Sequence, residues 1–356
     1  MEGNNYPYDF YNYSYHEYDS NYSTGLSEES AKSIEIAALV LYFITCFLGV
    51  PGNAFVVWIA GVKMKKTVNT IWFLNLAIAD FLCCLSIPFT VAEILLEHHW
   101  PYGDAMCKVI PTIIVVNMFT SIFTLNLISL DRFIQVVKPV WAQNNRTVRL
   151  AWICCAFAWT LAILLSLPTI ILRETVIEND HLNTNFTLCI FRNTDMEDEW
   201  STDYGGSYRA LTMARFVLGF LIPLLCIVFC YTGISRKIMS SHFRAGRAFR
   251  IMLAVVVAFF LSWFPYHVVD LVAIYGGTQE AVLAKDLDPL VISFAYANSC
   301  MNPILYVFMG QDFKEKVKHS LRRIFEMAFS EDNTMSSKGQ QSRCTNSSSY
   351  PAVMAT

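Results

Sequence analysis

The chain has 356 residues, of which 54% are apolar, 14% are aromatic and only 15% are charged, and its mean hydropathy is +0.40. A soluble domain carries about 25% charged residues. A chain of this length with so little charge cannot cover a globule with water-compatible groups, so a soluble enzyme and a disordered scaffold are poor interpretations. The net charge of −3 gives no argument for binding nucleic acid. The composition therefore predicts a membrane protein.

Long apolar runs recur along the chain and are separated by short polar loops. A membrane-spanning helix needs about 20 mostly apolar residues, and no alternating segments of about 10 residues suggest a barrel. We expect seven spanning helices at residues 35–62, 70–96, 106–137, 150–172, 208–235, 248–275 and 286–309. The predicted fold class is an all-α membrane protein, a bundle of seven transmembrane helices with a short amphipathic eighth helix.

The connections between the spans alternate in charge. Those after the first, third and fifth spans are basic, as at Lys63 and Lys65, and so is the segment after the seventh; the others are acidic, as at Glu197 and Asp198. Short loops rich in Lys and Arg stay on the cytoplasmic side of a membrane. The amino terminus is therefore expected outside the cell and the carboxyl terminus inside, in the plasma membrane.

Four segments make up the predicted organisation. Residues 1–33 form an acidic, Tyr-rich extracellular tail, and residues 34–310 form the transmembrane domain. Residues 311–329 are basic and amphipathic, which predicts a helix lying on the lipid of the inner leaflet. Residues 330–356 are rich in Ser and Thr and are expected to be disordered. Their hydroxyl groups either are merely solvated or take phosphate and recruit arrestin.

Several polar residues lie inside the apolar runs, where a charge costs at least a few kcal/mol. Asp80 stands in the run LNLAIADFLCC. Amides and hydroxyls from other spans could share its core, either as a hydrogen-bonded packing network or as oxygen ligands of a sodium ion beside the carboxylate. These residues are Asn53, Asn117, Ser121, Asn298 and Asn302.

Arg215 lies below the predicted outer surface, about two turns before Pro223. It either snorkels outward or acts together with Arg173 and Asp288 at the outer ends of other spans. Two arginines and one aspartate would suit a ligand that carries both charges, because Arg forks a carboxylate and Asp pairs with a cation.

The outer face also carries the expected modifications. Of the 11 cysteines, only Cys107 and Cys189 are predicted near the oxidising side, so a disulfide is expected between them. Asn12, Asn21 and Asn185 begin glycosylation sequons on that side. No metal site is predicted, because His98 and His99 have no third ligand at a suitable spacing.

Eight motifs in chain order make the sequence similar to rhodopsin-like G-protein-coupled receptors over its whole length. They are Gly52-Asn53, LNLAIAD ending at Asp80, Cys107, Asp131-Arg132-Phe133, Trp152, Pro223, Trp263-Phe264-Pro265 and Asn302-Pro303-Ile304-Leu305-Tyr306. The stretches HWPYG, NMFTSIF, KPVWAQN and ANSCMNPILYVFMGQDF resemble the chemoattractant branch, which includes anaphylatoxin, chemerin and formyl-peptide receptors.

Within this branch the chain most resembles receptors for the anaphylatoxin of complement component five, and next those for component three. Asp131-Arg132-Phe133, Lys138-Pro139, Asp288 and a short second outer loop carry this likeness, whereas MGQDF is closer to chemerin and formyl-peptide receptors. The resemblance implies a chemotactic receptor, not an enzyme, that binds a basic complement anaphylatoxin and signals to a heterotrimeric G protein of the inhibitory class. A chemerin or formyl-peptide receptor is the alternative, and a transporter or ion pump is disfavoured because neither repeats nor a retinal-binding Lys is found.

The resemblance also implies roles for individual residues. A sodium site would use Asp80, Asn117, Ser121, Asn298 and Asn302; a transmission core Ile122, Pro223, Phe259 and Trp263; an inner switch Asp131, Arg132, Tyr231 and Tyr306; and the ligand's terminal arginine would meet Arg173, Arg215 and Asp288. Tyr11, Tyr13, Tyr15 and Tyr18 would be sulfated in a tail that docks the basic ligand. The chain departs from the family at the start of the sixth helix. Arg244 and Arg247 stand where the family has an acidic residue that pairs with Arg132, so we expect Asp131 to be the main restraint on Arg132.

Overall fold

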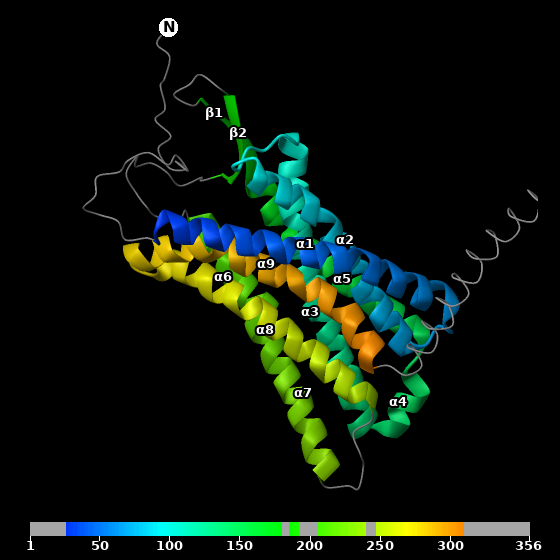
Figure 1. Cartoon of the computed structure of the whole chain (residues 1–356). Helices are drawn as coiled ribbons and strands as arrows, with labels where there is room; N and C mark the ends of the chain where they lie inside the picture. Colours follow the sequence, from blue (N-terminus) through cyan, green and yellow to red (C-terminus); the bar gives the residue numbers. More distant parts are fainter. Residues whose placement is uncertain (1–25, 180–184, 193–205, 240–246, 310–356) are drawn as a thin grey trace, which may run out of the picture.

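The computed structural model describes residues 26–179, 185–192, 206–239 and 247–309. Long helices dominate it, packed lengthwise into one bundle (Figure 1). In chain order the elements are α1 (Glu28–Trp58), η1 (Ile59–Lys63), α2 (Val68–Leu95), α3 (Gly103–Val137), α4 (Pro139–Asn145), α5 (Val148–Leu172), β1 (Arg173–Asn179), β2 (Asn185–Phe191), α6 (Gly206–Phe216), η2 (Val217–Leu221), α7 (Ile222–Met239), α8 (Arg247–Tyr275) and α9 (Thr278–Met309).

Every span expected from the sequence falls on a long helix, and the fifth runs continuously through α6, η2 and α7. Among the described residues, six helices are long and apolar enough to cross a membrane. The seventh, α9, has 32 residues but carries more polar groups, four of which are buried: Ser293, Asn298, Ser299 and Asn302. The predicted helical membrane fold is confirmed.

The helix α3 lies at the centre of the bundle, where it contacts α2, α5, α7 and α8. The helix α9 lies between α1 and α8 and contacts both. Large apolar side chains such as Phe47 and Phe229 are exposed on the outside of the bundle. An apolar outer face suits helices that are surrounded by lipid, whose backbone groups are satisfied within each helix.

Local sequence signals set where the helices begin and bend. Ser27, Thr67 and Thr147 cap α1, α2 and α5, each accepting a hydrogen bond from the backbone N–H three residues ahead. Pro223 has no N–H to donate, and the widened π-helical turn η2 lies directly before it. This turn separates Arg215, at the end of α6, from the rest of the span.

A polar contact inside the bundle involves a tryptophan other than the one named among the motifs. Asn75 of α2 donates to Thr124 of α3 and accepts from the indole N–H of Trp159 on α5, both at 2.6 Å. The tryptophan that joins the fourth span to its neighbours is therefore Trp159. Trp152, the motif residue, is 46% exposed near the start of α5.

The two ends of the bundle differ in their connections. At one end β1 and β2 form an antiparallel hairpin in which Arg173 pairs with Phe191 and Asn179 with Asn185. At the other end the short helix α4 joins α3 to α5 (Figure 1). Neither the hairpin nor α4 is indicated by the apolar runs, which locate only the spans. We call these the hairpin end and the α4 end.

Candidate functional site

At the hairpin end, Arg215 is the centre of a buried polar group. Its side chain is 7% exposed, and it donates to the hydroxyl of Tyr266 at 2.9 Å and to that of Thr212 at 3.0 Å. The nearest carboxylate belongs to Asp270 of α8, whose Oδ2 lies 3.5 Å from Nη2 of Arg215. The other oxygen of Asp270 accepts a hydrogen bond from Tyr208 at 3.2 Å. Arg215 is thus buried, and it does not snorkel.

Asp270 was not singled out from the sequence, although the signal was present. It lies within the apolar span 248–275, where the cost of a mid-bilayer charge draws attention to any carboxylate. Asp288, which was predicted to pair with a cation of the ligand, is partly buried on α9 and interacts electrostatically with Asp270, Arg173 and Arg215. It forms no ion pair within 4 Å among the described residues. Asp270 is therefore the direct counter-ion of Arg215.

Arg173 stands where α5 passes into β1. Its guanidinium lies over the ring of Phe191 at 4.3 Å and donates to the carbonyl of Cys189 at 3.2 Å. It also interacts electrostatically with Glu93 of α2. The structure thus brings Glu93, Arg173, Arg215, Asp270 and Asp288 to one end of the bundle, and we call them the hairpin-end cluster.

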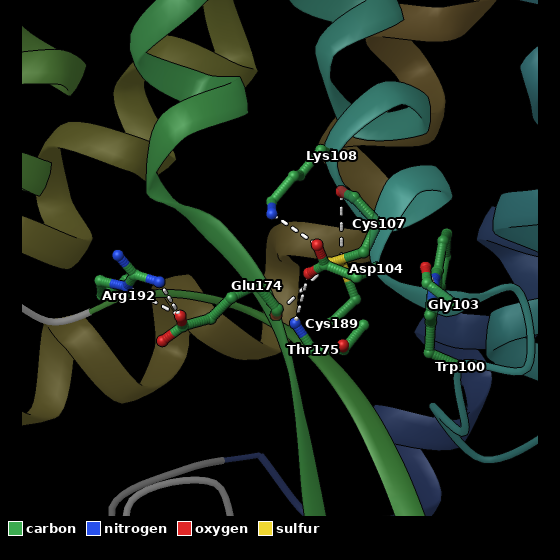
Figure 2. A network of polar contacts seen from close by, with 9 residues as sticks. All are labelled: Trp100, Gly103, Asp104, Cys107, Lys108, Glu174, Thr175, Cys189 and Arg192. Carbon is green, nitrogen blue, oxygen red and sulfur yellow. Dashed lines mark hydrogen bonds and ion pairs between the residues drawn. A yellow bond between two sulfur atoms is a disulfide. The ribbon is translucent and has the colours of Figure 1, made fainter.

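The predicted disulfide between Cys107 and Cys189 is present and ties the start of α3 to β2. Figure 2 shows the polar contacts around it: Asp104 pairs with Lys108 and accepts from the backbone N–H of Thr175 at 3.3 Å. On the hairpin itself, Arg192 pairs with Glu174, which raises the pKa of Arg192. These contacts fix the hairpin beside the hairpin-end cluster.

The loop between α2 and α3 supports the hairpin from the other side. The backbone N–H of Trp100 donates to the carbonyl of Thr187 at 2.7 Å, and the N–H of Thr187 donates to Nδ1 of His99 at 3.2 Å. Burial lowers the pKa of His98, although the carboxylate of Glu35 lies 3.9 Å away and opposes the shift.

Halfway through the bundle, Asp80 is completely buried and accepts from Asn302 at 2.6 Å. Asn117 donates to Ser299 at 3.2 Å and accepts from Ser121 at 3.4 Å, and Asn298 is buried on the same helix as Ser299. The residues predicted to share one polar core thus lie on α1, α2, α3 and α9. Asn53 of α1 donates to the carbonyl of Ser299 at 2.8 Å, so Ser299 joins them. We call Asp80, Asn117, Ser121, Asn298, Ser299 and Asn302 the central polar group.

The oxygen atoms of this group suit a small cation. Oδ1 of Asp80, of Asn302 and of the neighbouring Asn53 are buried and accept no hydrogen bond in the described part of the chain. Buried acceptors usually have a partner, and carboxylate and amide oxygens are ligands that hard cations prefer. The donor set therefore fits a sodium ion.

The predicted transmission core is assembled beside the central polar group. Ile122 and Phe259 are fully buried in one apolar cluster with Trp263, whose ring centroid lies 5.9 Å from that of Phe259. Pro223 is buried at the start of α7. The cluster lies along the bundle between the hairpin-end cluster and the α4 end.

At the α4 end, Asp131 binds Arg146 rather than Arg132. Arg146, the residue directly after α4, donates to the two carboxylate oxygens of Asp131 at 2.8 and 3.1 Å. Arg132 donates to Asn69 at 2.6 Å and to Gln135 at 3.3 Å. Arg132 therefore keeps only an electrostatic interaction with Asp131, while its hydrogen bonds go to other residues and the two arginines are linked through Asn69.

We call Asn69, Asp131, Arg132, Gln135 and Arg146 the α4-end cluster. Asn69 accepts from Arg146 as well as from Arg132, each at 2.6 Å, and Gln135 donates to Asp131 at 2.7 Å. Tyr231 of α7 interacts electrostatically with Arg132. Tyr306 lies on α9, but its side chain is outside the described residues, as are Asn12, Asn21 and the tyrosines 11, 13, 15 and 18.

A bundle of this kind, with a disulfide-tied hairpin at one end and a buried polar core, defines a seven-helix membrane receptor. Residues 52–306 match the family described as 7 transmembrane receptor (rhodopsin family). The chain belongs to this family. Its members are receptors, in agreement with the prediction that the chain is not an enzyme.

Curated relatives place the chain within the chemoattractant branch. The chain is 60% identical to a C3a anaphylatoxin chemotactic receptor of Danio rerio over 314 residues, covering 88% of this chain and 83% of the relative. It is 38% identical to the human C5a anaphylatoxin chemotactic receptor 1 over 330 residues (92% and 91%) and 42% identical to human Chemerin-like receptor 1 over 321 residues (88% and 85%).

These identities confirm the branch and reverse the expected order within it. The C3a receptor is far more similar than the C5a receptor, which the motif comparison had put first. The expected order depended on four local features, Asp131-Arg132-Phe133, Lys138-Pro139, Asp288 and a short second outer loop, whereas identity is counted over most of the residues.

Proposed function

We propose that the chain is a chemotactic receptor for a complement anaphylatoxin of the C3a type. The observation that carries this proposal is the 60% identity, over most of both chains, with a receptor named for C3a. The hairpin-end cluster supplies matching chemistry, because Arg215 and Arg173 suit a carboxylate while Asp270 and Asp288 suit a cation. A peptide ending in arginine carries both groups on one residue.

The hairpin end is proposed to face the outside of the cell. The disulfide between Cys107 and Cys189 needs an oxidising compartment, and the basic connections lie at the opposite end. The acidic tail of residues 1–33, sulfated at Tyr11, Tyr13, Tyr15 and Tyr18, would attract a basic ligand and speed the encounter. Asn12, Asn21 and Asn185 would be glycosylated on this side.

The α4 end is proposed to bind an inhibitory-class G protein and, after phosphorylation of the tail 330–356, arrestin. The ligand would bind one state of the bundle more tightly and so shift its population. In that state the contacts of Arg132 with Asn69 and Gln135 would open, together with Tyr231 and Tyr306. The basic stretch 311–329 would lie on the lipid of the inner leaflet.

The central polar group is proposed to hold a sodium ion through Asp80, with Asn117, Ser121, Asn298 and Asn302 around it. The Oδ1 atoms of Asp80 and Asn302, which accept no hydrogen bond among the described residues, support this proposal. The ion would neutralise the buried carboxylate and favour the signalling-silent packing of α2 against α9.

A response screen tests the function. Cells expressing the full chain are exposed to C3a, C5a, chemerin and a formyl peptide, and cyclic AMP and calcium are recorded. We expect C3a to act at the lowest concentration, with inhibition of cyclic AMP. A response to chemerin or to the formyl peptide, without one to either anaphylatoxin, would replace the proposal with its alternative.

A further inference from the structure

Asp270 raises a question that the proposed function leaves open, because it already neutralises the residue that would receive the ligand. Its side chain is 9% exposed, and its Oδ2 lies 3.5 Å from Nη2 of Arg215. Both residues lie within the membrane-spanning part of the bundle, where each ionised group needs an opposite charge. Without a ligand, Arg215 and Asp270 therefore serve as partners for one another.

The contact between them is loose. A charge-assisted hydrogen bond between nitrogen and oxygen spans about 2.7–2.9 Å, shorter than the separation here. Nε of Arg215 and Oδ2 of Asp270 make no hydrogen bond in the described part of the chain, although both residues are more than nine-tenths buried. Buried polar atoms of this kind normally have partners. The pair therefore keeps one donor and one acceptor for groups that the described residues do not supply.

The neighbouring side chains form hydrogen bonds with other atoms of Arg215 and Asp270, not with Nε or Oδ2. Tyr266 and Thr212 accept from the terminal nitrogens of Arg215, and Tyr208 donates to Oδ1 of Asp270. These bonds orient the guanidinium and the carboxylate without using Nε or Oδ2. His267, which is 2% exposed and interacts electrostatically with Arg215, also has a ring nitrogen, Nε2, without a hydrogen bond. Three buried polar atoms that lack a hydrogen bond among the described residues thus lie at or beside this ion pair.

We propose that Asp270 determines specificity by ion-pair exchange. When the ligand binds, its terminal carboxylate takes Arg215 and its cationic side chain takes Asp270, so that one internal pair becomes two pairs across the interface. This inference rests on the proposed function and adds a requirement to it. The ligand must bring both charges together on its last residue.

A ligand with one charge alone is rejected by this arrangement. A peptide with a terminal carboxylate and an apolar last side chain would take Arg215 and leave Asp270 buried without a partner. An amidated peptide ending in arginine would pair with Asp270 and leave Arg215 buried without a partner. Leaving a buried charge unpaired is strongly unfavourable, so the internal pair discriminates against both classes.

Three peptides and one substitution test this exchange. The peptides share the carboxyl-terminal sequence of C3a and end in arginine with a free carboxylate, in citrulline (a neutral counterpart of arginine) with a free carboxylate, or in arginine amide. On the unaltered receptor we expect the first peptide to bind about 100-fold more tightly than the other two. In Asp270→Asn the arginine peptide weakens while the citrulline peptide binds more tightly than before, because Arg215 is no longer engaged.

Opposite changes for two peptides cannot come from a merely structural role of Asp270. An equal loss for all three peptides, or no change for any, overturns the proposal. Asp270→Glu is the matched control, since it keeps the charge and should keep the preference for arginine over citrulline.

A second variant is used if Asp270→Asn does not reach the cell surface, because an Arg215 without its counter-ion could prevent folding. The double variant Arg215→Gln with Asp270→Asn leaves no unpaired charge in this pair. It should bind the three peptides with less than about 10-fold difference, and a retained 100-fold preference contradicts the exchange. If no C3a peptide binds the unaltered receptor, the proposed function itself is wrong, and that result is seen before any variant is compared.

Discussion

An arginine–aspartate pair lies near each end of the bundle, and the two pairs differ in geometry. Arg215 and Asp270 at the hairpin end are separated by 3.5 Å, with side chains 7% and 9% exposed. Arg146 and Asp131 at the α4 end are joined by two hydrogen bonds of 2.8 and 3.1 Å, and their side chains are 26% and 11% exposed. The deeper pair is the looser one.

This difference in geometry indicates that the two pairs have different roles. The hairpin-end pair retains unused donors and acceptors in a place where leaving them unused is costly, which suits a site that a ligand completes. In the α4-end pair both carboxylate oxygens of Asp131 are engaged, and Asn69 links Arg146 to Arg132. Such a closed network suits a restraint that holds the bundle in one state until the ligand favours another.

The largest effect is expected from Arg215→Gln. Removing one partner of a buried charge pair costs about 2–5 kcal/mol, so the potency of a C3a-type agonist should fall by about 100-fold or more. Basal signalling should not change, because the α4-end cluster is intact. Agonist titration with surface labelling measures both, and Lys285→Gln, an exposed charge on α9, is the control. A rise in basal signalling would contradict the assignment of ligand binding to one pair and of restraint to the other.

A change in the opposite parameter is expected from Arg146→Gln. Losing the paired hydrogen bonds to Asp131 removes about 1.5–3 kcal/mol of restraint, of which part would appear as a basal activity raised by about 10-fold. Agonist affinity should change far less than in Arg215→Gln. Arg149→Gln, at an exposed position just beyond α4, is the matched control. Unchanged basal activity would show that Arg146 does not restrain the silent state.

The central polar group lies halfway through the bundle, between the two pairs. The variant Asp80→Asn tests whether this group holds a cation. The amide keeps the shape of the side chain and removes its charge. Sodium should lower agonist affinity several-fold on the unaltered receptor and have no effect on the variant, with potassium as the control salt. Equal sodium dependence of the two receptors would exclude Asp80 as the ion's ligand.

The smallest effect is expected from Asp104→Asn at the start of α3. Its contacts with Lys108 and Thr175 lie at the surface (Figure 2), and exposed ion pairs contribute little. Agonist potency should change less than about threefold. A larger loss in a receptor that reaches the surface normally would mean that the hairpin's position, and not only the buried pair, sets affinity.

The spans could be predicted because each is a long apolar run, and the disulfide because only two cysteines were predicted beside the outer ends of the spans. The partner of Arg215 could not be assigned in the same way, because periodicity does not show which carboxylate a neighbouring helix brings within reach. Asp270 carried the same signal as Asp80, a charge within an apolar span, and only the packing of α6 against α8 makes it the counter-ion.

Two further differences have similar causes. Trp152 and Trp159 are seven residues apart and so project from nearly the same face of α5, and only the depth of Asn75 shows which one is bound. Arg146 reads as one more basic residue in a cytoplasmic loop. The short helix α4 carries the chain back so that Arg146, the residue after it, meets Asp131.

The most direct test of the account is the binding of a C3a carboxyl-terminal peptide to the unaltered receptor, with and without its last arginine. Competition against labelled C3a on cell membranes gives both affinities in one experiment. The account predicts that removal of this one residue weakens binding by about 100-fold or more, because both charges that the hairpin-end cluster pairs are lost or displaced. Equal affinity of the two peptides would contradict the assignment of Arg215 and Asp270 as the ligand-reading pair.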